Sequence, residues 1–358
     1  MMKNTSDKAA RVVGTPKSDS FDALVRWSFA QQSSAANEGV RGGSSPPAAG
    51  GILISLFFLL FFPSSLPAWG AVSIVDDSGA AITLAEPARR VVPLYAGLGE
   101  LLAALGAGDF VVGRTPGDES APGAPIIGTH MRPDLERIAA LSPDLAVQVE
   151  GRDEAAAAAE ALQKIGVPTA RFRITNYEDL FSCIRRLGVL TGREREAEAL
   201  TRAYRDRLEA VRRKAEALPA GPSVFFEVRY PNLLGAGGDN MTTAIIAAAG
   251  GRNVFADRPG KILRLNEEAV IAANPDVYLQ QVGPMNKNPS APAERPGYAA
   301  LVAVREGRVC RVPEEIFSRP GPSSVTAAET LVEIFTRLAE QDKADAAKED
   351  SPPGTVSQ

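Results

Sequence analysis

A chain of 358 residues, 45% of them hydrophobic, is long enough to bury the cores of two globular lobes, and its formal net charge of −4 does not indicate a nucleic-acid-binding surface. One histidine and two cysteines leave few side chains for metal ligation or nucleophilic catalysis. A zinc or manganese site, which usually takes several imidazole or carboxylate ligands, is therefore disfavoured.

The N-terminal segment differs in composition from the rest of the chain. Residues 1–51 are rich in Ser, Gly, Ala and Pro, and an uninterrupted apolar run follows at residues 52–62. This run is too short to span a bilayer comfortably. Arg41 precedes it, and the small residues Ala68 and Gly70 follow it at positions −3 and −1 of a cleavage site, a pattern typical of a secretory signal peptide.

We therefore predict an N-terminal extension and signal peptide over residues 1–70, cleavage near Gly70, and export to the periplasm. No cysteine follows the apolar run that would support a lipoprotein anchor. A membrane-anchoring helix is the alternative, and the depth of the run within the chain leaves open a later start at Val40.

From Val72 onward, strand patterns alternate with helix patterns, as in α/β proteins with a largely parallel sheet. An Asp-Ser-Gly turn separates the first two strands, and a third strand begins after Pro87. We assign residues 71–191 to an N-terminal lobe. Its further predicted helices are Leu98–Leu105, Pro133–Ala140, Asp153–Ile165 and Asn176–Thr191, and its further strands are Phe110–Gly113, Leu145–Val149 and Thr169–Ile174.

A long charged helix is predicted over residues 192–218. Its apolar residues recur at three- and four-residue spacing, at Ala197, Leu200, Tyr204, Leu208, Val211 and Ala215. A helix of about 24 residues is ~36 Å long, and its mostly charged surface suits an external position. We interpret it as a linking helix between two lobes.

A second α/β lobe is predicted over residues 219–340, and the polar segment 341–358 has the composition of a disordered tail. The strands of this lobe are predicted at Ser223–Val228, Val277–Gln280 and Val309–Val312, and its helices at Met241–Ala249, from Asn266, and at Ser323–Glu340. The fold class is therefore α/β, with two Rossmann-like lobes of parallel type joined by one long α-helix.

One phrase occurs in both lobes. "RPDLERIAALSPDLAVQ" at Arg132–Gln148 and "RLNEEAVIAANPDVYLQQ" at Arg264–Gln281 each place a carboxylate early in a short helix, before a Pro-Asp turn and an apolar strand. Together with "LLAALGAGDFVVGRT", "AAGGRNVF" and "FSRPGPSSVTAAETLVEIF", this ordered series resembles the substrate-binding proteins of iron-siderophore, haem and cobalamin ABC importers over roughly Ser73 to Ala339. The resemblance implies two lobes tied by a single helix, with the ligand in a shallow cleft between them.

The resemblance also implies a role for the two carboxylates. By position they are Glu136 and Glu268, which would dock onto arginines of an inner-membrane permease, with Glu267 as a close competitor for Glu268. A carboxylate can accept a bidentate hydrogen-bond pair from a guanidinium. The alternative is that these residues are ordinary first-turn acids that favour the helix dipole.

Ligand contacts are expected from loops at the carboxyl ends of the strands, since open α/β sheets bind ligands there. The candidate ligand-binding residues in these loops are Tyr95, His130, Arg152, Arg229, Tyr230, Asn240, Phe317 and Arg319. Cleft arginines would suit anionic catecholate or carboxylate chelates. We therefore expect a ferric siderophore first, then cobalamin or haem, with no permanently bound cofactor.

His130 is the one candidate metal ligand, and only for haem iron. It lies in the loop where haem-binding relatives carry a tyrosine ligand, although it does not match that residue one for one. A structural or solvent-exposed histidine is the alternative interpretation.

Other classes of protein have weaker support. The glycine-rich run from Gly235 lacks the G-x-G-x-x-G spacing because residue 240 is Asn, and no Walker, H-E-x-x-H or G-x-S-x-G phrase is present. We predict a monomeric binding protein rather than an enzyme. The alternatives are a divalent-metal or oxyanion-binding protein of similar fold, and a secreted hydrolase. Cys183 and Cys310 are predicted to be unpaired thiols, because a link between the lobes would restrict the cleft.

Overall fold

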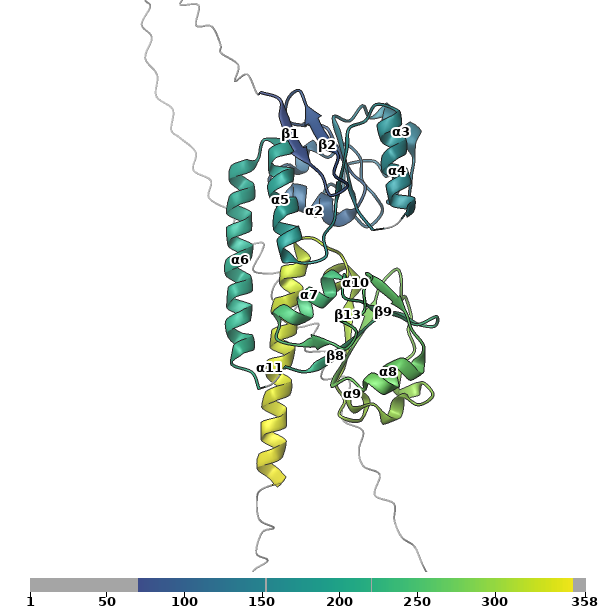
Figure 1. The fold of residues 1–358 in the computed structure, drawn as a ribbon, viewed down its shortest axis with the longest axis vertical. Helices are drawn as coiled ribbons and strands as arrows, with labels where there is room; N and C mark the ends of the chain where they lie inside the picture. Colours follow the sequence, from purple (N-terminus) through teal and green to yellow (C-terminus); the bar gives the residue numbers. More distant parts are fainter. Residues whose placement is uncertain (1–69, 152, 220, 350–358) are drawn as a thin grey trace, which may run out of the picture.

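The computed structural model describes residues 70–151, 153–219 and 221–349, which form two α/β lobes beside long helices (Figure 1). Residues 1–69 of the predicted signal peptide segment lie outside the described residues, and so does Arg152. Within the described part of the chain, no helix has the length and apolar character needed to cross a membrane.

The first lobe contains a three-stranded parallel sheet in the order β3-β6-β7, flanked by helices. Its strands are β1 (Val72–Val75), β2 (Ala81–Leu84), β3 (Val91–Pro93), β4 (Gly128–Thr129), β5 (Arg132–Pro133), β6 (Leu145–Val149) and β7 (Thr169–Phe172). Its helices are α2 (Ala96–Ala104), α3 (Leu135–Ala140), α4 (Asp153–Lys164) and α5 (Tyr177–Thr191), with a short 3-10 helix at Gly108–Phe110. The strand predicted at Phe110–Gly113 is reduced to one bridge between Val111 and Val91.

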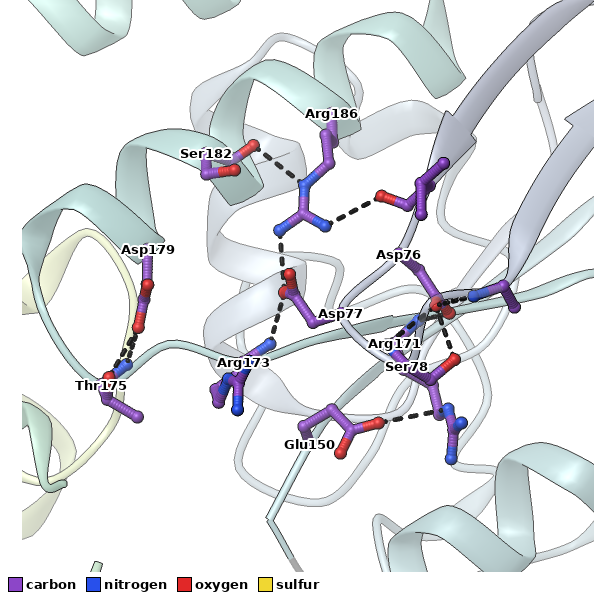
Figure 2. Close-up of polar contacts among 12 residues, drawn as sticks. Asp76, Asp77, Ser78, Glu150, Arg171, Arg173, Thr175, Asp179, Ser182 and Arg186 are labelled. Carbon is purple, nitrogen blue, oxygen red and sulfur yellow. Dashed lines mark hydrogen bonds and ion pairs between the residues drawn. The ribbon is translucent and has the colours of Figure 1, made fainter.

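The hairpin of β1 and β2 is tied to this lobe by buried and half-buried carboxylates (Figure 2). Asp76 accepts hydrogen bonds from the backbone N–H of Ser78 at 2.9 Å and of Arg171 at 2.9 Å. Asp77 accepts from the backbone N–H of Arg173 at 2.7 Å and from the guanidinium of Arg186 at 2.8 Å. These bonds hold the hairpin against β7 and α5.

The second lobe contains a six-stranded mixed sheet. Its strands are β8 (Ser223–Arg229), β9 (Leu234–Ala236), β10 (Arg252–Asn253), β11 (Ile262–Arg264), β12 (Val277–Val282) and β13 (Val309–Pro313). Its helices are α7 (Met241–Ala248), α8 (Glu267–Ala273), α9 (Val302–Arg305), α10 (Glu314–Phe317) and α11 (Ser323–Glu349), with 3-10 helices at Pro292–Glu294 and Tyr298–Ala300. Strands β10, β8, β12 and β13 are parallel, whereas β9 and β11 are antiparallel to their neighbours. The short β8–β9 connection requires this, since parallel neighbours need a long crossover.

Helix α6 (Glu194–Glu216) lies along the outside of both lobes (Figure 1). Its apolar stripe is buried at Ala197, Tyr204 and Val211, as the helical spacing predicts. Two arginines of α6 reach neighbouring helices: Arg205 pairs with Glu178 of α5 at 2.9 Å, and Arg207 pairs with Glu329 of α11 at 2.7 Å. The predicted fold of two lobes joined by one long helix is confirmed.

One cluster of buried apolar side chains extends through both lobes and the helices beside them. It includes Leu98 of α2, Leu187 of α5, Phe226 of β8 and Leu331 of α11. The two lobes and the helices beside them therefore share one continuous apolar interior. Cys183 of α5 and Cys310 of β13 are both buried, and no disulfide joins them.

The C-terminal helix differs from prediction. Residues 341–349, expected as part of a disordered tail, continue α11, which ends at Glu349. The segment contains Ala, Lys, Glu and Gln, which are good helix formers, and no proline until Pro352. An ion pair of 2.6 Å between Arg308 and Asp342 also connects this part of the helix to the lobe.

Candidate ligand-binding cleft

A cavity of about 670 Å³ lies between the lobes, a size typical of small-molecule sites. Its first-lobe wall comes from the start of α2, the loop at residues 115–120 and the β4–β5 turn. Its second-lobe wall comes from Pro284 after β12, from α10 and from the loop that precedes α11. Three of these segments, the start of α2, Pro284 after β12 and α10, follow the carboxyl ends of parallel strands, where open α/β sheets bind ligands.

The first-lobe wall brings two predicted residues together. Tyr95 precedes α2, and its ring lies edge-on to the ring of His130, with 5.8 Å between centroids. Burial raises the pKa of Tyr95, so its hydroxyl stays neutral. The β4–β5 turn that carries His130 is held by buried Gln148 of β6, whose Nε2 donates to the His130 carbonyl at 2.8 Å.

The second-lobe wall is also fixed by hydrogen bonds to the backbone. The Glu314 carboxylate accepts from the backbone N–H of Met285 at 2.8 Å and so joins α10 to the loop after β12. Thr242 of α7 donates to the Phe317 carbonyl at 2.8 Å. Ser318 hydrogen-bonds the side chain of buried Gln281. The α10 segment is therefore held from three sides.

The two walls meet through an ion pair. Nη1 of Arg319 lies 2.6 Å from Oε1 of Glu100 on α2, and both side chains are about one-quarter exposed. Burial raises the pKa of Glu100, although Arg319 opposes this shift. Burial lowers the pKa of Arg319, but Glu100 more than offsets this, so its pKa is raised. Arg319 is thus a cation that already has a carboxylate partner.

The cleft is acidic overall. Among the described residues that line it, the charged side chains are Glu100, Glu119, Glu314, Glu315 and Arg319. Four carboxylates therefore face one guanidinium, which is itself paired. A negative cleft with low-dielectric walls favours uncharged or cationic ligands over anions.

The described residues contain no group of three or more His, Cys, Asp or Glu that could hold a metal ion.

Four predicted ligand residues are not brought into the cleft. Asn240 caps α7, accepting from the backbone N–H of Thr242 at 3.0 Å, and Phe317 is fully buried against Phe226. Tyr230 lies beneath the guanidinium of Arg295, 3.7 Å from its ring centroid. Arg229 has a buried Nε with no hydrogen-bond partner among the described residues. None of these four side chains is among the residues that line the cavity, and Arg152 lies outside the described residues.

Several lining residues escaped the sequence prediction. Glu100 lies inside a helix that reads as a simple core helix, and the loop at 115–120 has no distinctive residue pattern. The acidic pair Glu314-Glu315 follows β13 directly, so the strand-end rule used for the other loops also applies to it.

The repeated phrase forms two equivalent short helices, one in each lobe. Asp134 caps α3 by accepting from the third helical N–H, and Asn266 caps α8 in the same way. Glu136 and Glu268 are each the second residue of their helix, and both are exposed. Glu267 is half-buried and precedes this position. The helix position therefore pairs Glu136 with Glu268 rather than with Glu267.

Comparison with known proteins agrees with this architecture. The periplasmic binding protein family matches residues 91–316. The chain is 27% identical over 270 residues to an uncharacterized ABC transporter substrate-binding lipoprotein, YvrC, of Bacillus subtilis, covering 73% of this chain and 84% of the relative. It is also 27% identical over 275 residues to a cobalamin-binding protein of Halobacterium salinarum, covering 73% of each. The apo periplasmic heme-binding protein RhuT from Roseiflexus sp. RS-1 has a TM-score of 0.62 and 28% identity, covering 70% of this chain and 99% of that one.

Proposed function

Because the chain belongs to the periplasmic binding protein family, as a substrate-binding component of an ABC transporter for metal chelates, we propose that its ligand is an uncharged or cationic corrinoid of the cobalamin class. The ligand would lie between the lobes and be delivered to the membrane permease. The protein carries out no bond chemistry in this role.

The observation that carries this proposal is the charge of the cleft. An anionic chelate would have to give up its hydration shell beside four carboxylates. Arg319, the one arginine among the described residues that line the cleft, is already paired to Glu100. This argues against a catecholate ferric siderophore, the ligand class that the sequence favoured first. The cobalamin-binding relative from Halobacterium supports the corrinoid.

Haem is the second candidate, and His130 is the observation that favours it. The imidazole lies in the cleft wall beside Tyr95, and imidazole is a common axial ligand of haem iron. The heme-binding relative from Roseiflexus supports this alternative. The two propionates of haem would meet the same acidic cleft, which is why we place haem second.

Calorimetric titration of the protein with four chelates tests the ligand class. The set is cyanocobalamin, a ferric trihydroxamate with a free ammonium arm, a ferric tris-catecholate and haemin. We expect the uncharged cobalamin to bind and the tris-catecholate to show no saturable heat. Tighter binding of the tris-catecholate than of cyanocobalamin would overturn the proposal. A Soret band that shifts in the H130A variant would select haem instead.

We also propose that Glu136 and Glu268 dock onto arginines of the permease, one from each lobe. Both carboxylates are exposed at the second position of capped helices, so their oxygens are available to a partner's guanidinium. Export to the periplasm, with cleavage near Gly70, is part of the same proposal, since an importer collects its ligand outside the inner membrane.

A further inference from the structure

The backbones of the two lobes are in close contact where the first turn of α2 meets the loop before α11. A Cβ atom placed on Gly97 would lie 2.2 Å from the Pro320 carbonyl oxygen, and one placed on Gly321 would lie 3.2 Å from the Cα of Gly97. This is contact between two backbones, with no flexible side chain between them. It fixes the distance between Glu100, one turn further along α2, and Arg319, which directly precedes Pro320.

A second carboxylate, that of Asp118, lies against α2 beside Glu100. Asp118 is fully buried, and its Oδ1 accepts from the backbone N–H of Ser120 at 3.0 Å. Its Oδ2 lies so close to Gly99 that a Cβ there would be 2.0 Å away, and this oxygen has no hydrogen-bond partner among the described residues. The negative charge of Asp118 acts on Glu100 and favours a cation beside it.

Arg319 therefore lines the cleft as a cation whose charge is already balanced by a carboxylate. Glu100 uses part of its hydrogen-bonding capacity, and Glu315 adds a further negative charge nearby. A ligand anion could approach the guanidinium only by competing with a carboxylate that the backbone contact holds in place. The same guanidinium without Glu100 would be a binding site for a carboxylate or catecholate oxygen.

We infer that Glu100 is a specificity-determining residue that excludes anionic chelates by occupying Arg319. This inference rests on the proposed function, because it explains how a cleft with an arginine selects against anions. It predicts that the ratio of affinities for anionic and uncharged ligands changes when Glu100 is neutralised, whichever chelate the wild-type protein prefers.

The test compares cyanocobalamin with its monocarboxylate, in which one amide has become a carboxylate, so that the two ligands differ by one charge and little in shape. In the E100Q variant we expect the affinity for the monocarboxylate relative to cyanocobalamin to rise about tenfold or more, the usual effect of one hydrogen bond to a charged group. The E100Q/R319Q double variant should lose this gain. An unchanged ratio in E100Q, or a gain that survives in the double variant, would overturn the inference.

Two further variants keep the test decisive. E119Q removes the same charge from an exposed lining residue, and it should change the ratio by much less than E100Q does. R319Q leaves Glu100 unpaired, so it should shift the ratio in the opposite direction, against the monocarboxylate. If E100Q does not fold, an unshifted ratio in R319Q overturns the inference on its own.

Failure of the proposed function gives a different result. If the wild-type protein binds no cyanocobalamin, the corrinoid proposal fails, and the same ratio is measured between the ferric tris-catecholate and the ammonium-bearing trihydroxamate. The expected direction of change in E100Q and R319Q is the same for that pair. If the wild-type protein binds none of these chelates, both proposals are wrong.

Discussion

The two lobes differ in how their sheets are tied to the segments around them. In the first lobe, carboxylates accept hydrogen bonds from backbone N–H groups, as Asp144 does from Arg89 at 2.9 Å and from Arg90 at 2.8 Å. In the second lobe, a fully buried ion pair between Glu227 of β8 and Arg295 connects the sheet to the loop after β12. Carboxylates of the second lobe also accept from backbone N–H groups, as Asp276 does from Ser223 at 2.8 Å, but only this lobe has a fully buried ion pair among the described residues.

The second-lobe ion pair has a complete set of polar partners. Tyr278 and Gln280 of β12 both donate to Glu227, and Asn286 donates to it at 3.2 Å. Arg295 also donates to the Ser290 carbonyl at 2.7 Å. Tyr230 packs on the guanidinium of this network and is not among the residues that line the cavity. A buried pair of this kind is costly to break from one side, because the remaining charge has no solvent.

The largest effect is expected at α3 and α8, the helices that carry Glu136 and Glu268, where we expect the two lobes to contribute equally to docking. Reversing both charges in E136K/E268K should reduce ligand uptake to background, because each reversal replaces an expected attraction to a permease arginine with repulsion. Ligand affinity of the purified protein should not change. The measurement is uptake in cells that express the variant with its permease.

Single reversals sharpen this result. E136K and E268K should impair uptake to similar extents if both lobes dock, while E160K, an exposed change on α4, should not affect it. A normal uptake rate in the double variant would disprove docking. A loss in E267K equal to that in E268K would show that the assignment between these two neighbours is wrong.

The second-largest effect is expected from the buried ion pair. R295M leaves Glu227 buried without its cation, which should lower the free energy of unfolding by about 3–5 kcal/mol. Urea denaturation measures the loss, and hydrogen exchange should locate it in β8 and β12. R205M, which breaks an exposed pair with Glu178, should cost less than about 1 kcal/mol. Equal losses in the two variants would mean that the second lobe does not depend on this pair.

Much of the fold follows from local patterns. The cap at Asn176, the glycine after α5 at Gly192 and the apolar spacing of α6 are short-range features that specify helices before any tertiary contact forms. The antiparallel strands β9 and β11 were missed because each has only three residues, and their pairing depends on the rest of the sheet.

The cleft was predictable as a set of loops but not as a set of side chains. Strand ends identify the loops, yet whether a residue in a loop faces the other lobe depends on the packing of both lobes. The apolar side chain of Phe317 is buried in the core. Glu100 lines the cleft where α2 meets the loop that carries Arg319. Contacts between segments more than 200 positions apart leave no local pattern to detect.

A smaller effect is expected from the distributed contacts of the first lobe. D76A removes a buried carboxylate that accepts four hydrogen bonds, from the N–H and hydroxyl of Ser78 and from the N–H groups of Ala80 and Arg171. We expect the free energy of unfolding to fall by about 1–3 kcal/mol. S73A, which removes an exposed hydroxyl contact with Thr83, should change it by less than about 0.5 kcal/mol. A D76A loss larger than that of R295M would reverse the contrast between the lobes.

The smallest effect is expected at Glu100, where the lobes meet, and it is a change of the free energy of unfolding with pH. The sign of this change distinguishes burial from the attraction of Arg319. Burial raises the pKa of Glu100 in the folded protein despite the nearby Arg319, so between its unfolded and folded pKa values the folded state binds more protons than the unfolded state. The contribution of Glu100 to stability therefore falls as pH rises through this window and is greatest below it. E100Q should lack this dependence, so the wild-type free energy of unfolding, relative to that of E100Q, should fall as pH rises above about 4.3, the ordinary pKa of a glutamate. Denaturation of both proteins across this range measures the difference. If it rises instead, the attraction of Arg319 outweighs burial, and Glu100 would hold the guanidinium more firmly at neutral pH than its raised pKa implies.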